Sequence, residues 1–170
     1  MVAEYQRKFA SLLLLWKGIG AYVARNPETP VLLGAVSISR GYSSASRELI
    51  VKYFESRQRN PLSQFVRPRR PFRPPPLHSW NCAAVSTVLR GFEDLGHSVS
   101  HLETDAKGIP VLVRQYLKLG ASVLAFNVDR NFSDVLDGLV CLDLRRTEPT
   151  ALERYMAKDG LARFQQFHRE

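Results

Sequence analysis

The stretch GIPVLVRQYLKLGASVLAFNVDRNFSDVLDGLVCLDL, residues 108–144, decides the fold class because it places a helix pattern directly before two strand patterns. Gly108 and Pro110 are typical of a helix start, and Gly120 is typical of a helix end. The apolar runs 122–128 and 139–144 then predict two strands joined by a loop rich in Asp and Asn. A helix followed by two apolar strands predicts a mixed α/β fold.

The segments outside this stretch extend the same fold class. The apolar run 31–39 predicts a buried strand, and Gly41 with Ser43 and Ser44 predicts the start of a helix after it. Residues 81–95 have apolar side chains at helical spacing, with Gly96 as the expected helix end. Two further helical segments are expected around 152–156 and 161–167. Apolar strands of this kind predict a mixed sheet with helices on both faces.

Residues 9–23, FASLLLLWKGIGAYV, superficially have the form of a signal peptide, because Arg7 and Lys8 precede an apolar run. The uninterrupted apolar part covers only residues 12–16 and ends at Lys17, whereas a membrane-spanning helix needs roughly 20 apolar residues. Apolar side chains from Tyr5 to Val23 recur at helical spacing. An amphipathic helix of a packed domain is therefore expected here.

The positive charge of the chain is concentrated in its first half. The whole sequence has 24 Lys and Arg against 16 Asp and Glu, for a net charge of +8, but residues 1–80 hold 13 of these basic residues and 4 of the acidic ones. Such an imbalance attracts anions, whether nucleic acid, anionic lipid, a phosphorylated cofactor or an acidic protein. Charge alone does not choose among them.

Much of this charge lies in a proline-rich segment. Residues 60–79 contain six of the ten prolines, so this segment is expected to be an extended connection, neither helix nor central strand. Its arginines are Arg67, Arg69, Arg70 and Arg73. Three interpretations remain open for them: a nucleic-acid arm in which Phe65, Phe72 and Trp80 stack on bases, a contact with an anionic membrane surface, or a solvated linker.

The loop after residue 128 carries five oxygen-bearing side chains: Asp129, Asn131, Ser133, Asp134 and Asp137. A calcium loop is excluded, because its sixth position is Asp where a glycine turn is needed and its twelfth is Val where a bidentate Glu is needed. The carboxylates are therefore either turn formers or a site for a cationic amine.

The remaining motifs give little sign of chemistry. His97 and His101 have the spacing of a helical metal pair, but Gly96 and Ser98 disfavour a helix there and no third ligand is nearby, so no metal site is expected. Cys82 and Cys141 are expected to be small core residues. The sequence contains no GxxxxGK[ST], GxGxxG or GxSxG motif, which removes the usual support for a kinase, a dinucleotide dehydrogenase or an α/β-hydrolase.

The ordered motifs PVLVRQYLKLG (110–120), FNVD (126–129) and FSDVLDGL (132–139) resemble the bacterial GNAT-fold N-acyltransferases often labelled putative hemolysins, which are similar to the ornithine-lipid-forming N-acyltransferases. The resemblance extends to residues 4–27, 32–51, 66–72 and 152–164. It implies a partial GNAT-like fold in which the strands that normally come first are absent from the sequence. Residues 1–60 would then be the second half of the donor-binding core, 61–80 an extended connection and 81–170 the acceptor side.

The same resemblance implies fatty-acyl transfer from an acyl thioester to an amine or lipid precursor in membrane lipid synthesis, with no bound cofactor. Gln6, Arg7 and Lys8 would contact the donor phosphate. Because the glycine pair usual for coenzyme A is absent, the resemblance favours an acyl carrier protein as donor, whose acidic surface would suit the basic first half. Candidates for the acceptor side are Arg114, Tyr116, Lys118, Asp129 and Asp137.

These implications place the chain in the cytoplasm, peripheral to the inner membrane, and leave open whether it is active by itself. The alternative function is a non-catalytic basic module that binds anionic lipid or nucleic acid through its four arginines, nucleic acid being the less expected partner. Pore formation is not implied, because no segment resembles one that pierces a membrane.

Overall fold

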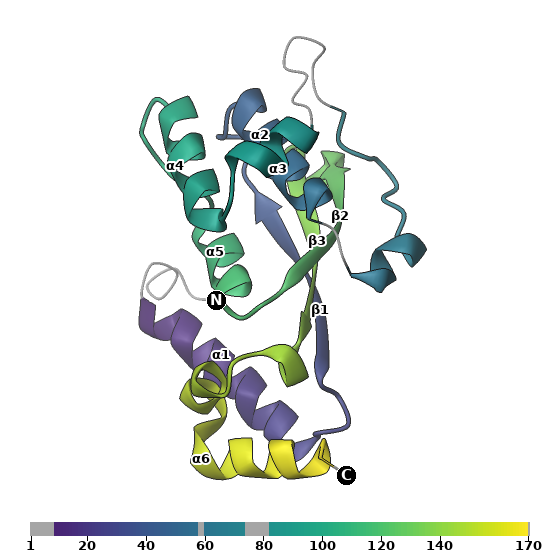
Figure 1. Cartoon of the computed structure of the whole chain (residues 1–170), viewed down its shortest axis with the longest axis vertical. Coiled ribbons are helices and arrows are strands. Elements are labelled where there is room, and N and C mark those ends of the chain that lie inside the picture. The colour runs from purple at the N-terminus through teal and green to yellow at the C-terminus, as the bar shows by residue number, and fades with distance from the viewer. Residues whose placement is uncertain (1–8, 58–59, 74–81, 170) are drawn as a thin grey trace. The chain divides into compact units, whose positions relative to one another are not determined.

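The computed structural model describes residues 9–57, 60–73 and 82–169 (Figure 1). The helices are α1 (Phe9–Arg25), α2 (Ser44–Ser56), α3 (Cys82–Val88), α4 (Phe92–Leu102), α5 (Val111–Lys118) and α6 (Pro149–Phe167), with short 3-10 helices η2 (Pro61–Phe65), η3 (Arg130–Phe132) and η4 (Leu144–Arg146). The strands are β1 (Val31–Ile38), β2 (Ser122–Asp129) and β3 (Val135–Asp143). The mixed α/β class predicted from the sequence is confirmed.

The chain divides into two compact units that are described separately. The first unit consists of the residues up to 32 and from 143 onward, and it contains α1 and α6. The second unit consists of residues 33–142. In the first unit α1 and α6 pack against each other at Gly20, where an added Cβ would lie 2.5 Å from the carbonyl oxygen of Tyr155. Glycine is therefore required for the close approach of the two helices.

The described part of α1 has the amphipathic character expected from its sequence. Trp16 and Val23 are buried, whereas Leu14 is 68% exposed. Trp16 also contacts the ring of Tyr155 on α6, with 5.7 Å between ring centroids. The two C-terminal helical segments predicted from the sequence form one element, α6, which is interrupted at Ala157, where φ is 59°.

The second unit is built on a three-stranded antiparallel sheet, with strand order β1-β3-β2 within the described residues. Asn127 on β2 lies opposite Asp137 on β3, and the register shifts between Val123 and Ala125, which leaves Leu124 as an extra residue in β2. The sheet is thus antiparallel where the sequence predicted a mixed one.

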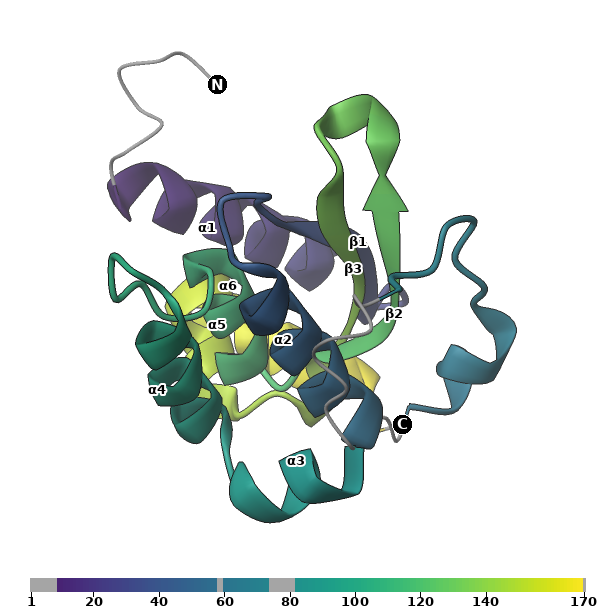
Figure 2. The ribbon, with the colours of Figure 1, turned by 90° about the horizontal axis from the view of Figure 1, so that it is seen from above.

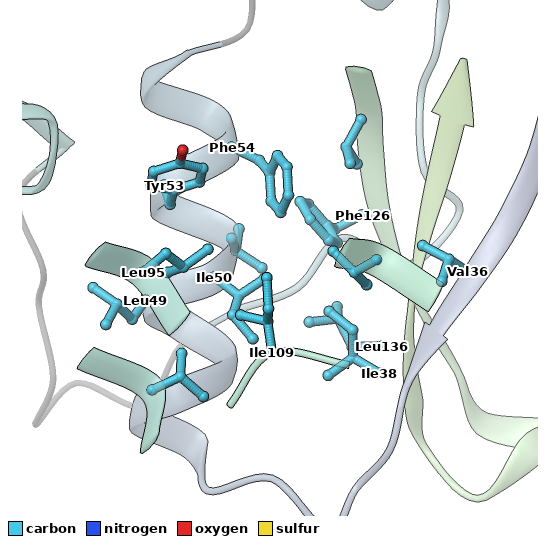
Figure 3. Packing of buried hydrophobic residues seen from close by; sticks show 14 of the residues in the cluster. Val36, Ile38, Leu49, Ile50, Tyr53, Phe54, Leu95, Ile109, Phe126 and Leu136 are labelled. Carbon is cyan, nitrogen blue, oxygen red and sulfur yellow. The ribbon is translucent and has the colours of Figure 1, made fainter. Parts of the chain in front are cut away.

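The core of this unit lies between one face of the sheet and α2 (Figure 3). The strands contribute Val36, Ile38, Phe126 and Leu136, all of which are buried. Phe54 of α2 contacts Phe126 at 5.8 Å between ring centroids. The other labelled members are Leu49, Ile50, Tyr53, Leu95 and Ile109. Because side chains alternate along a strand, residues 35, 37, 127 and 137 face the opposite side of the sheet.

The helix expected over residues 81–95 is wrong in its extent. The structure has two helices there, α3 and α4, and α4 runs through Gly96 to Leu102. The carboxylate of Asp94 accepts hydrogen bonds from the backbone N–H groups of Arg90 and Gly91, at 2.8 and 3.2 Å. These bonds start a new helix after Gly91 and separate it from α3.

The second predicted strand also begins earlier than expected, at Val135 instead of Leu139. The loop before it is short because Ser133 and Asp134 both have positive φ, at 57° and 52°. This left-handed pair turns the chain tightly and allows residues 135–138 to pair with β2. Among the described residues, no helix has the length and apolar content needed to cross a bilayer.

Candidate functional site

The arginine-rich segment 60–73, called the strap from here on, lies along the side of β2 away from β3 (Figures 1 and 2). Asn60 Nδ2 donates to Ser122 Oγ at 2.7 Å at one end of the strap. At the other end Arg70 N donates to Asn127 Oδ1 at 2.9 Å, and Val128 N donates to Arg70 O at 2.8 Å. The prolines predicted an extended connection here, but Pro61–Phe65 form the 3-10 helix η2, so the prediction is wrong for these residues. The strap is attached to the sheet at two points.

The four strap arginines, Arg67, Arg69, Arg70 and Arg73, are all exposed. The ion pairs formed among the described residues involve other side chains, so these four guanidinium groups have no carboxylate partner there. Four neighbouring cations without counter-charges repel one another and create a field that attracts an anionic partner.

The strap also exposes two large apolar side chains. Leu62 is 41% exposed and Phe65 is 78% exposed, and both lie on η2, which ends two residues before Arg67. Burial of such groups in an apolar phase is favourable by about 25 cal/mol per Å² of apolar surface. Exposed aromatic and aliphatic groups beside cations are typical of segments that lie in the headgroup region of a membrane.

A cavity of about 230 Å³ lies between the strap, the C-terminal part of α2 and β2. Apolar side chains predominate among the lining residues, the exceptions being Ser63 and Glu55, but polar atoms form about half of the exposed lining. The lining residues are Val51, Phe54, Glu55, Ser63, Val66, Pro68, Pro71, Phe72, Val123, Leu124, Ala125 and Phe126.

A row of polar groups crosses the sheet on the face opposite the core. Ser37 Oγ donates to Asp137 Oδ1 at 2.5 Å, linking β1 to β3. Asn127 lies beside Asp137 in the register and accepts the strap hydrogen bond from Arg70 N. Asp137 is half-buried, so it is a carboxylate held in place at the centre of this row.

The structure does not bring the five acceptor-side candidates together. Arg114, Tyr116 and Lys118 lie on α5, and Tyr116 packs against the core cluster. Asp137 lies on the other face of the sheet, because its neighbours on β3, Leu136 and Gly138, face the core. Arg114 has a buried Nε without a hydrogen-bond partner, and Lys118 is exposed.

The carboxylates of the β2–β3 loop act as turn formers and surface groups. Asp129 accepts from Asn131 N at 2.9 Å and caps η3. Asp134 lies 3.6 Å from Arg40, with both side chains largely exposed. Asp129, Asp134 and Asp137 each have a different partner, so they do not form a joint site for a cationic amine.

Sequence reasoning missed a polar cluster at the start of α2. Glu103, 8% exposed, accepts from Ser43 N at 2.8 Å and lies 3.2 Å from Lys107 Nζ. Burial raises the pKa of Glu103, but hydrogen bonds from Ser46, Ser43 and Lys107 outweigh burial and lower the pKa to about 2. The only local signal was the N-cap pattern at Ser43, because its partner Glu103 is 60 residues away.

Other sequence expectations have mixed outcomes. Gln6, Arg7 and Lys8 lie outside the described residues, as does the side chain of Cys82. His97 and His101 are on α4, so the doubt about a helix there was wrong, but both are exposed. Among the described residues no His, Cys, Asp and Glu side chains cluster as metal ligands. Cys141 is a buried core residue, as expected.

Comparison with known proteins adds no identity to this geometry: no family model, no curated protein and no solved structure matches the chain significantly.

Proposed function

We propose that the chain binds an anionic lipid surface through the strap and serves fatty-acyl transfer there. The observation that carries the first part is the composition of the strap: four exposed arginines without carboxylate partners follow two exposed apolar side chains, Leu62 and Phe65. Each basic residue near an anionic membrane contributes about 1 kcal/mol, so four contribute on the order of 4 kcal/mol. Insertion of Phe65 adds an apolar contribution that salt does not screen.

Nucleic acid fits the same segment less well. A single-strand binding arm combines cations with aromatic rings that are free to stack on bases. Phe72 lines the cavity and is half-buried, which leaves Phe65 as the exposed aromatic side chain of the strap. Trp80, the third ring that the sequence offers for stacking, lies outside the described residues. Within the strap, one exposed ring beside four arginines favours a lipid surface over a base-stacking platform.

The test is co-sedimentation with vesicles of phosphatidylcholine alone or mixed with phosphatidylglycerol. The test variant changes Arg67, Arg69, Arg70 and Arg73 to Gln. The matched control changes four other exposed arginines, Arg130, Arg154, Arg163 and Arg169, to Gln, which gives the same net charge.

Wild type is expected to bind the anionic vesicles, with affinity that falls as salt rises. The strap variant should lose on the order of a thousandfold, as four contributions of about 1 kcal/mol imply. The control variant should lose much less. Equal loss in the two variants would show that net charge, and not the strap, is responsible. Tighter binding of single-stranded DNA than of the vesicles would favour the nucleic-acid alternative.

Acyl transfer is proposed from the resemblance to the GNAT-fold N-acyltransferases, and two features of the second unit support it. Asp137, held by Ser37 at 2.5 Å, is a placed carboxylate that can accept the proton of an attacking amine. Strand β1 pairs with β3 alone among the described strands, so its other edge is able to pair with a further strand of a larger sheet. The donor, on this proposal, is an acyl carrier protein or coenzyme A thioester.

The reaction is tested by following thiol release from a long-chain acyl thioester in the presence of a panel of amines. Asp137→Asn should abolish amine-dependent release, and Asp129→Asn, at a turn-forming carboxylate of the same hairpin, should not. If wild type releases no thiol with any amine, the proposal of acyl transfer is wrong, and the proposal of lipid binding is unaffected. Equal rates in Asp137→Asn and wild type would remove Asp137 from the proposal.

A further inference from the structure

We infer that the cavity beneath the strap holds the hydrocarbon end of a single anionic amphiphile whose headgroup binds the strap arginines. This inference rests on the proposed lipid binding and specifies its ligand: one molecule with a phosphate or carboxylate head and an alkyl chain. It differs from surface attraction alone, because it predicts recognition of a monomeric ligand in the absence of any membrane.

The strap separates its charges from its apolar groups. Val66 and Pro68 line the cavity and are half-buried, whereas Arg67 and Arg69 are exposed. This alternation follows from the extended backbone of the strap. The remaining strap arginines are also chain neighbours of lining residues: Arg70 precedes Pro71, and Arg73 follows Phe72. Every strap arginine is therefore within one residue of the cavity wall.

The opposite walls of the cavity offer apolar side chains to an alkyl chain, beside polar atoms. They are formed by buried side chains of α2 and β2, among them Val51, Phe54 and Val123. The one charged lining residue, Glu55, forms an ion pair with Lys52 at 2.8 Å. Because the strap arginines are exposed and lie outside the cavity wall, the headgroup binds outside, at the arginines, and the chain enters.

The cavity has room for the end of a chain, not for a whole lipid. A methylene group occupies about as much space as a water molecule in the liquid, roughly 30 Å³. The volume of about 230 Å³ therefore accommodates on the order of seven or eight methylene groups. Sites that enclose a whole drug-sized ligand are larger, about 300 to 1,000 Å³.

The way in which the strap is attached accounts for the cavity. Asn60 and Arg70 fix the strap to β2 at Ser122 and Asn127, as described above. Between these two attachments the strap has nine residues, 61–69, whereas β2 has four, 123–126. The longer strap segment therefore arches away from the strand. The register shift between Val123 and Ala125 lies in the same interval. With both ends attached, the arch is prevented from closing onto the sheet.

The experiment is calorimetric titration of the whole chain with n-alkyl phosphates of increasing length, each below its micelle concentration. Inorganic phosphate supplies the head without a chain, and octyltrimethylammonium supplies the chain with the opposite charge. Affinity should rise about fourfold for each added methylene, as burial of one methylene implies. The rise should stop near eight carbons, where the cavity is full. Affinity independent of chain length, or equal affinity for the ammonium compound, would overturn the inference.

Two variants place the ligand in the cavity. Val66→Phe and Ser63→Leu enlarge lining residues and should weaken octyl phosphate binding at least tenfold. The matched control is Val111→Phe, at a 64% exposed valine on α5 that is not part of the cavity wall. If both lining variants, folded by circular dichroism, bind octyl phosphate as wild type does, the ligand lies elsewhere and the inference is wrong.

The two proposals fail in different ways. Salt-dependent vesicle binding without any dependence on chain length leaves the proposed lipid surface in place and removes the cavity ligand. Absence of vesicle binding by wild type removes the proposed function. In the lining variants the strap arginines are intact, so vesicle binding is expected to be close to that of wild type. Vesicle binding that falls in step with octyl phosphate binding would mean that chain insertion carries the surface affinity as well.

Discussion

Replacing Glu103 by Gln tests whether the polar cluster at the start of α2 stabilises the second unit through charge. The substitution keeps the size and one carbonyl oxygen of the side chain, but it removes the charge that Ser43 N and Lys107 Nζ contact at 2.8 and 3.2 Å. The pKa of Glu103 is lowered from 4.5 to about 2. At about 1.4 kcal/mol per pKa unit, the ionised carboxylate contributes at most about 3.5 kcal/mol to the free energy of unfolding at pH 7.

The dependence on pH has a definite sign. In the unfolded chain Glu103 has its ordinary pKa of 4.5, and in the folded chain it has a pKa of about 2. A carboxylate with a lowered folded pKa contributes its full stabilisation above the unfolded value and loses it as the pH falls toward the folded value. Wild type and Glu103→Gln should therefore differ most above pH 4.5 and converge near pH 2.

The assay is urea denaturation followed by far-ultraviolet circular dichroism at neutral pH and at acid pH. The control is Glu93→Gln, which removes an exposed carboxylate from the first turn of α4 and should change the free energy of unfolding by less than about 1 kcal/mol. Equal effects of the two substitutions at pH 7 would refute the reasoning. So would a difference between wild type and Glu103→Gln that persists near pH 2.

Three further predictions concern single contacts. Ser43→Ala removes the N-cap of α2 and should lower the free energy of unfolding by about 1 kcal/mol in urea denaturation. Gly20→Ala forces a Cβ to within 2.5 Å of Tyr155 O and should lower the melting temperature, whereas Gly18→Ala, with open space around it, should not. Asn127→Ala removes one attachment of the strap and should speed hydrogen exchange of the Val128 amide, which bonds to the strap at 2.8 Å.

Much of the fold was predictable where the signal is local. Pro110 precedes α5 and Gly120 follows it with φ of 82°, so the residues that start and stop this helix are readable from the sequence. The division between α3 and α4 was also readable, because Gly91 followed three residues later by Asp94 is the pattern of a helix start. It was missed because apolar side chains continue at helical spacing across the break.

The candidate site was predictable only in its composition. The strap is extended after Val66 and its arginines are exposed, but residues Pro61–Phe65 form the 3-10 helix η2 where the prolines predicted an extended chain. The strap is attached to the sheet by two contacts, whose partners are separated by 57 and 62 positions in the sequence. No local sequence pattern encodes contacts over such a separation. The separation of Asp137 from the α5 candidates could be predicted in part. Side chains alternate along a strand, so Asp137 and Leu136 must lie on opposite faces of the sheet. Knowing which face α5 covers required the structure.

The attachment of the strap also bears on the interpretation as a solvated linker. A linker needs reach and flexibility, and hydrogen bonds at both ends of the strap would reduce both. Instead, prolines fix φ along the strap while Asn127 and Ser122 hold its ends. A cationic segment restrained in this way loses less conformational entropy when an anion binds than a free chain does, so its affinity per arginine is higher. Asn127→Ala removes one of the strap's hydrogen bonds and no positive charge, so it should weaken anion binding by loosening the strap. An unchanged affinity for anionic vesicles would support the linker.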